Sequence, residues 1–165
     1  IIIILLFIIL QPQLLRAEII KVTEIQFNKN CESFIKGLRN RNIGSCNYEK
    51  NELNPVSGKS IKINQLLQIT EKKKSRCTVQ MQLTKADSKL RSEVTCNFNR
   101  LQLNQVYSFH SAILKLKSYE YDKSSCDDKN RQCSIIINKE NFINVFVLGI
   151  INKYCMFKMS PEKLK

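Results

Sequence analysis

Histidine occurs once among the 165 residues, as His110, and tryptophan does not occur at all. No two cysteines have the Cys-x-x-Cys spacing, so neither a zinc site nor a Cys/His nucleophile pair is indicated. The sequence has no Asn-x-Ser/Thr sequon, and its apolar runs fall short of the roughly 20 residues that a membrane-spanning helix needs. We therefore expect a non-enzymatic protein without a metal, another cofactor or a transmembrane segment.

Acidic residues are few: 14 Asp and Glu stand against 27 Lys and Arg, for a net charge of +13. A strongly basic secreted protein is expected to meet polyanions such as sulfated glycans, or anionic membrane surfaces. Aromatic residues are not interleaved with the lysines, which argues against specific nucleic-acid recognition. The candidate contact residues lie in two predicted turns and are Lys72, Lys73, Lys74, Arg76, Lys85 and Lys89.

The chain opens with ten apolar residues, Ile1 to Leu10, followed by a polar break and by Leu15-Arg16-Ala17. This arrangement is typical of the apolar segment and cleavage site of a signal peptide. We expect residues 1–17 to be a signal peptide, with its upstream end incomplete, and residues 18–165 to form a single secreted, disulfide-containing domain. Removal of Arg16 would lower the net charge to +12, because the segment carries no other charge.

Seven cysteines follow the apolar segment, and in a secreted protein they indicate disulfides. Cys31 and Cys46 bracket a predicted helix and are expected to pair. For the last three cysteines two solutions stay open: Cys133 with Cys155, which leaves Cys126 free, or Cys126 with Cys133, which leaves Cys155 free. Because seven is odd, the remaining thiol could link two chains into a dimer.

Hydrophobic spacing predicts one short helix followed by strands. Residues 30–41 have helical spacing behind a candidate N-cap, Asn30, whereas residues 18–27 fit a strand or the start of a helix. From Ser60 onward apolar residues alternate with polar ones, and residues 105–121 and 134–154 continue this pattern. We therefore expect an α+β fold: one short N-terminal helix and a disulfide-stabilised antiparallel sheet of about five strands.

The clearest alternation surrounds a polar turn at residues 85–89. A turn centred between Ala86 and Asp87 would place Cys77 directly opposite Cys96. Directly opposed residues have Cα atoms about 4.5 to 5.5 Å apart, which suits a disulfide. The spacing therefore predicts a hairpin closed by a Cys77–Cys96 bridge.

Three stretches, residues 66–83, 77–98 and 133–155, resemble the cystatin superfamily, including the cathelicidin pro-region. The resemblance implies a secreted inhibitor of proteases, or a derivative that has lost its inhibitory loops. Gln105 and Val106 begin a segment similar to the family's QxVxG inhibitory loop and become candidate contact residues. Phe109 stands where the family has glycine, and the family's tryptophan wedge is missing.

Three functions follow from these patterns. The first is a secreted binding module, with a protein partner such as a protease. The second is a basic host-defence protein that binds glycans or membrane surfaces. The third is a carrier of a small apolar ligand, whose cavity would be lined by Phe142, Val145, Phe146, Val147 and Leu148.

Overall fold

A computed structural model describes residues 19–53, 57–88, 90–122, 125–127 and 132–161. The expected signal peptide, residues 1–17, and the candidate contact residue Lys89 lie outside the described residues.

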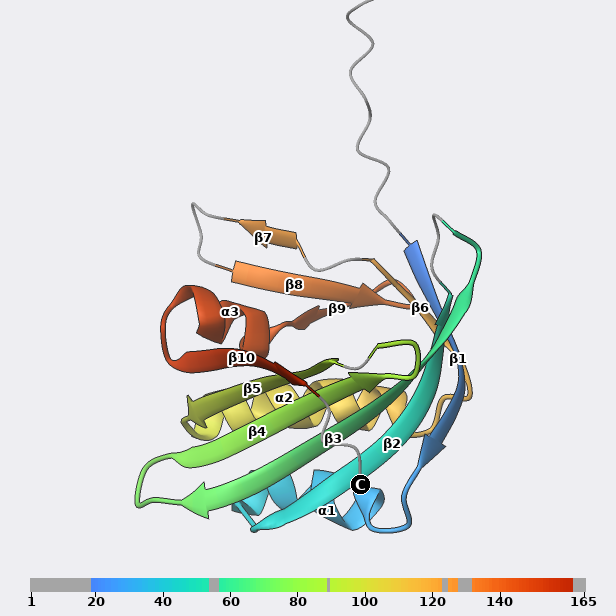
Figure 1. Ribbon diagram of the computed structural model, residues 1–165. Coiled ribbons are helices and arrows are strands. Elements are labelled where there is room, and N and C mark those ends of the chain that lie inside the picture. The colour runs from blue at the N-terminus through green and yellow to red at the C-terminus, as the bar shows by residue number, and fades with distance from the viewer. Residues whose placement is uncertain (1–18, 54–56, 89, 123–124, 128–131, 162–165) are drawn as a thin grey trace, which may run out of the picture.

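Strands make up most of the fold (Figure 1). One antiparallel sheet has the order β10-β5-β4-β3-β2-β1-β6-β8-β7, and β9 pairs with β8 to complete ten strands. The expectation of an α+β fold with about five strands is therefore wrong. Five further strands follow residue 100 and are only three to seven residues long, too short to display a clear period. The strands are β1 (Ile19–Phe27), β2 (Gly44–Leu53), β3 (Ser60–Lys72), β4 (Cys77–Lys85), β5 (Leu90–Phe98), β6 (Tyr119–Asp122), β7 (Ser125–Asp127), β8 (Gln132–Ile137), β9 (Glu140–Ile143) and β10 (Cys155–Pro161).

The helix predicted within residues 30–41 is present as α1 (Cys31–Gly37), which begins after Asn30 and continues into a short 3-10 turn, η2 (Leu38–Asn40). Two further helices, α2 (Arg100–Ile113) and α3 (Val145–Ile151), replace predicted strands. The strand expected over residues 105–121 is wrong except at its end, where Tyr119 to Tyr121 belong to β6. The residues up to Ile113 form α2 instead, and a capping box at Asn99 marks its start.

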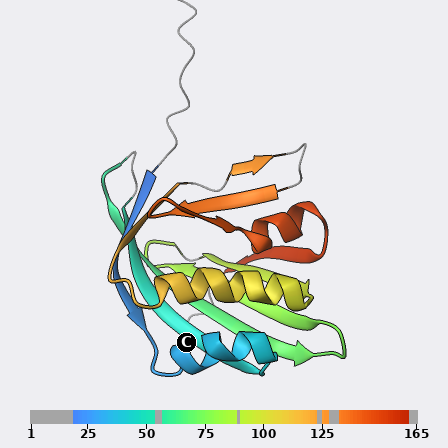
Figure 2. The ribbon, with the colours of Figure 1, turned by 180° about the vertical axis from the view of Figure 1, so that it is seen from behind.

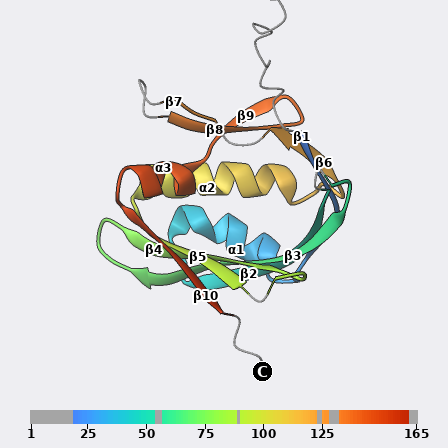
Figure 3. The same cartoon turned by 45° about the horizontal axis from the view of Figure 1, so that its top comes forward.

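The sheet curls around its helices. Figure 2 shows α1 and α2 lying side by side on its concave face. Figure 3 shows that both helices lie between the long strands β2–β5 and a second layer formed by β7, β8 and β9, with β1 and β6 at the bend. Residues from both layers and both helices pack into one hydrophobic core, including Tyr48, Leu67, Phe98, Val106 and Ile137. The concave side of the sheet is therefore the interior of the molecule.

The hairpin of β4 and β5 exists, but its register differs from the prediction by two residues. Cys77 pairs with Phe98, and Cys96 pairs with Val79. The difference arises at the turn: Thr84 pairs with Arg91, so the turn is centred one residue later than expected. A shift of two residues keeps every side chain on its face, because side chains alternate along a strand. The predicted Cys77–Cys96 bridge is nevertheless wrong.

Three disulfides are present. Cys31–Cys46 ties α1 to β2, as expected, and Cys126–Cys133 joins paired positions of β7 and β8, which settles one of the two alternatives. Cys155 bonds to Cys96 because β10 returns to pair with β5, which overturns the expected Cys133–Cys155 bridge. The remaining thiol, Cys77, is buried at the start of β4, so it cannot form the expected disulfide-linked dimer unless that end of the strand opens.

Three disulfides are typical of proteins from oxidising compartments. Within the described ranges, no helix combines the length and the apolar character that crossing a bilayer requires.

Candidate functional site

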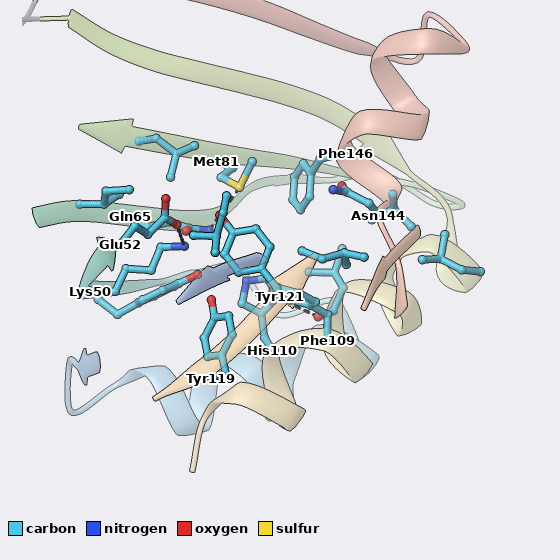
Figure 4. Close-up of a pocket in the computed structure, with 18 of the residues that line it drawn as sticks. Lys50, Glu52, Gln65, Met81, Phe109, His110, Tyr119, Tyr121, Asn144 and Phe146 are labelled. Carbon is cyan, nitrogen blue, oxygen red and sulfur yellow. Dashed lines mark hydrogen bonds and ion pairs between the residues drawn. The ribbon is translucent and has the colours of Figure 1, made fainter. Parts of the chain in front are cut away.

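A cavity of about 380 Å³ lies between the concave face of the sheet, α2 and the β8–β9–α3 segment (Figure 4). Its volume is in the range of small-molecule sites, about 300 to 1,000 Å³. Apolar and aromatic side chains form most of its surface. The lining residues are Ile20, Tyr48, Lys50, Glu52, Ile63, Gln65, Met81, Leu83, Lys85, Gln105, Val106, Phe109, His110, Tyr119, Tyr121, Ile135, Ile143, Asn144, Val145 and Phe146.

Strands β2, β3 and β4 form one side of the cavity, which we call the sheet wall. Alternate residues of each strand point inward, and the register aligns them in rows across the sheet. One row joins Tyr48, Gln65 and Leu83. The next row joins Lys50, Ile63 and Lys85. The period of two thus brings polar and apolar side chains together on one inward face.

The opposite side, which we call the helix wall, consists of the lining residues of α2, β8, β9 and the start of α3. On α2, the lining residues lie on one face because their spacing matches the helical repeat; they are Gln105, Val106, Phe109 and His110.

The start of α2 is fixed by a capping box. Asn99 Oδ1 accepts a hydrogen bond from the Gln102 backbone N–H at 2.9 Å, and Gln102 Oε1 accepts one from the Asn99 backbone N–H at 2.8 Å.

Helix α3 starts at the edge of the cavity. Asn144 caps it, since its Oδ1 accepts a hydrogen bond from the Val147 N–H at 3.2 Å. The first two helical residues, Val145 and Phe146, are buried and turned toward the cavity. The Phe146 ring also packs edge-on against Phe98 of β5, with centroids 5.2 Å apart. This contact connects the helix wall to the main sheet.

A cluster of polar side chains lies at one end of the cavity, opposite Phe146 and Asn144 (Figure 4). Lys50 Nζ is 2.7 Å from Glu52 Oε1, and the two side chains are only 10% and 20% exposed. The Lys50 ammonium also forms a hydrogen bond with the Tyr119 hydroxyl group. Burial alone would lower the pKa of Lys50, but Tyr119 and Glu52 outweigh it, so the pKa is raised and the ammonium keeps its charge.

Tyr48 completes this cluster through a side-chain hydrogen bond to Gln65. Burial is the main reason why the pKa of Tyr48 lies well above its ordinary value, so the phenol is neutral at physiological pH. The Gln65 side-chain amide also donates to Met81 Sδ at 3.3 Å. The sheet wall therefore satisfies its buried polar groups largely within itself.

His110 differs from that cluster. Its Nδ1 lies 2.8 Å from the Val106 carbonyl oxygen, which can only accept, so Nδ1 carries the proton and Nε2 is an acceptor. Nε2 is buried and has no hydrogen-bond partner among the described residues. Burial lowers the pKa of His110 to about 4, with Lys50 adding to the effect and the Val106 hydrogen bond opposing it. The imidazole is therefore neutral at physiological pH.

The predicted basic contact residues fall at opposite ends of β4. Lys72, Lys73, Lys74 and Arg76 lie at the exposed β3–β4 turn, where Arg41 also donates to the Lys74 carbonyl oxygen at 2.9 Å. Lys85 is at the other end of the strand and lines the cavity. The structure thus brings the first four together and separates them from Lys85.

Gln105 and Val106, expected in a contact loop, lie within α2 and line the cavity, so the loop interpretation is wrong. Of the residues expected to line an apolar cavity, Val145 and Phe146 do so. Phe142 packs against Phe109 of α2, with ring centroids 5.9 Å apart. Val147 and Leu148 are not among the lining residues.

Sequence reasoning missed the polar end of the cavity. Tyr48, Lys50 and Glu52 alternate along β2 in phase with Cys46, and a cysteine expected in a disulfide marks a buried face. This alternation could have shown that Tyr48, Lys50 and Glu52 face the interior. It could not reveal Tyr119, which comes from a strand 69 positions after Lys50 in the sequence.

The chain matches no protein-family model, and comparisons with curated proteins and with solved structures found no match either. We therefore infer its function from the cavity.

Proposed function

We propose that the protein is a secreted carrier that binds one small, mainly apolar molecule in the cavity between the sheet wall and the helix wall. The cavity itself is the observation that carries the proposal. Its volume of about 380 Å³ and its predominantly apolar lining are those of a ligand site with a few polar groups for orientation.

Secretion is part of this proposal. It is supported by the three disulfides, which are typical of oxidising compartments, and by the apolar run at residues 1–10. A carrier suits this setting because it only has to bind and release its ligand.

Titration with N-phenyl-1-naphthylamine, a neutral apolar dye whose fluorescence rises in apolar surroundings, tests the proposal. We expect saturable binding at micromolar concentration by the tag-free domain from residue 18 onward. Native mass spectrometry of the freshly purified protein should in addition detect any apolar molecule that it retains.

Two leucine-to-tryptophan variants locate the binding. Leu83→Trp places an indole in the cavity and should weaken dye binding by at least about tenfold, because the space for the ligand is filled. Leu101→Trp is the matched control, since Leu101 is 67% exposed and does not line the cavity. No saturable binding by the wild type, or equal weakening by both variants, would overturn the proposal.

Protease inhibition and polyanion binding stay predictions from the sequence. A papain inhibition assay and a heparin column test them directly. The cavity favours neither function, because both depend on residues at the surface.

A further inference from the structure

We propose that the ligand of the cavity is a neutral amphipathic alcohol, whose hydroxyl group donates a hydrogen bond to Nε2 of His110. This inference rests on the proposed carrier function and specifies its ligand class. Among the described lining residues, Nε2 of His110 is a buried acceptor without a partner, whereas Lys50 is paired with Glu52 and Tyr48 with Gln65.

The orientation of the His110 ring is fixed by a hydrogen bond. Its Nδ1–H bonds to the Val106 carbonyl of the same helix, so the far side of the ring, which carries Nε2, projects away from that backbone. His110 lines the cavity and is only 2% exposed. A buried acceptor left without a donor is unfavourable. Nε2 has almost no exposed surface, so a hydroxyl group of the ligand would reach it with a small shift of the side chains around it, and would then remove that penalty.

The neighbouring groups decide which kind of donor fits. A cationic amine is disfavoured because the Lys50 ammonium is close enough to act on the imidazole, and that ammonium stays charged. A carboxylate has no proton to donate and would meet the Nε2 lone pair. An uncharged hydroxyl group supplies a donor without adding charge.

The remainder of the cavity suits an aliphatic or alicyclic body. Phe109 is adjacent to His110 along α2, and Val145 and Phe146 lie farther along the helix wall. At the other end of the cavity, Lys50 and Glu52 are in direct contact. Among the described lining residues, Nε2 of His110 is therefore the buried side-chain atom that lacks a hydrogen-bond partner.

Two isomers test the hydroxyl directly. Octan-1-ol and 1-methoxyheptane have the same formula, but only the alcohol can donate a hydrogen bond. In competition with N-phenyl-1-naphthylamine, the alcohol should displace the dye about tenfold more effectively than the ether, the effect expected of one well-placed buried hydrogen bond. Octanoate should be weaker than the alcohol.

A His110→Phe variant tests whether the imidazole causes the preference for the alcohol over the ether. Phenylalanine keeps the aromatic shape beside Phe109 and Tyr48 but has no acceptor, so both isomers should bind within about twofold of each other. A preference that persists in the variant would overturn the assignment to His110.

Nuclear magnetic resonance gives a readout that needs no variant. His110 is the only histidine, so its ¹⁵N imidazole signals are unambiguous in the tag-free protein. Octan-1-ol should shift the Nε2 resonance, and 1-methoxyheptane should leave it nearly unchanged.

The outcomes separate the two proposals. Equal displacement of the dye by both isomers would overturn the alcohol inference and leave the carrier function standing. Failure of the dye itself to bind would overturn the carrier function, and with it this inference.

Discussion

The two walls of the cavity are built in different ways. The sheet wall consists of strands of nine to thirteen residues, whose register is continuous except between Ile69 and Glu71 of β3. Its buried Lys50 is paired with Glu52. The helix wall combines α2 with the short elements β8, β9 and α3, and it contains a buried acceptor, Nε2 of His110, that has no partner in the described part of the chain. One wall is thus held by the hydrogen-bonded ladder of three long strands, whereas the other is assembled from four separate elements.

The largest effect is expected where β10 and α3 are fastened to the main sheet. Replacing Cys96 and Cys155 by alanine opens a loop of 59 residues, which should lower the free energy of unfolding by about 4 kcal/mol. The control replaces Cys126 and Cys133, whose loop spans 7 residues, and should cost about 2 kcal/mol. Urea unfolding measures both, and an equal or reversed ranking would contradict this role of the Cys96–Cys155 bridge.

The paired cluster of the sheet wall should be nearly as sensitive. Lys50→Met leaves the Glu52 carboxylate buried without its cation, which should destabilise the protein by about 3 kcal/mol. The double variant Lys50→Met/Glu52→Leu should recover most of that loss, because no unpaired charge remains. Both effects are measurable by urea unfolding.

An exposed pair provides the control. Lys36 and Glu32 are also 2.7 Å apart, but their side chains are 68% and 62% exposed. Lys36→Met should leave the unfolding midpoint unchanged, because exposed pairs contribute little. Equal losses from Lys36→Met and Lys50→Met would show that burial is not what makes the inner pair important.

Acid should act on the helix wall through His110. Its pKa is about 4 in the folded protein, below the ordinary value of 6.5, so the unfolded chain binds the proton more readily. The neutral His110 side chain contributes fully to the free energy of unfolding above pH 6.5. This contribution is lost as the pH falls toward 4, and the loss amounts to about 3 kcal/mol. Urea unfolding as a function of pH measures this loss, and His110→Phe should remove its histidine component. A slope between pH 6.5 and 4.5 that is unchanged in the variant would assign the loss to carboxylates instead.

The smallest effects are expected at the helix caps of the same wall. Asn144→Ala removes the side-chain acceptor at the start of α3 and should cost about 1 kcal/mol. Asn99→Ala at the start of α2 should cost a similar amount, and both are measurable by thermal unfolding. Because Asn144 lines the cavity and Asn99 does not, only Asn144→Ala should also change the affinity for the dye.

Sequence patterns predicted the sheet wall better than the helix wall, for a physical reason. Long strands such as β3 and β4 repeat their alternation often enough to be recognised. The α2 segment carries apolar residues that also fit an alternating pattern, and the decisive signal was the Asn99–Gln102 capping box. In α3, seven consecutive apolar residues have no period, so only Asn144 indicates a helix.

Pairings between distant segments could not be read from local spacing. The Cys96–Cys155 bridge depends on β10 returning to the edge of β5, across two intervening helices and four strands. The candidate site has the same limitation. Val145 and Phe146 were predicted to line it, whereas the contact of Lys50 with Tyr119 exists only because β1 lies between β2 and β6.

The buried thiol of Cys77 can be used to detect local opening of the protein. Its side chain is buried and belongs to no disulfide, so a water-soluble alkylating reagent can reach it only when the start of β4 opens. Each such event would leave one irreversible mass increment per molecule. Because the other six cysteines are oxidised, the rate of alkylation would measure how often the start of β4 opens, with and without a bound ligand.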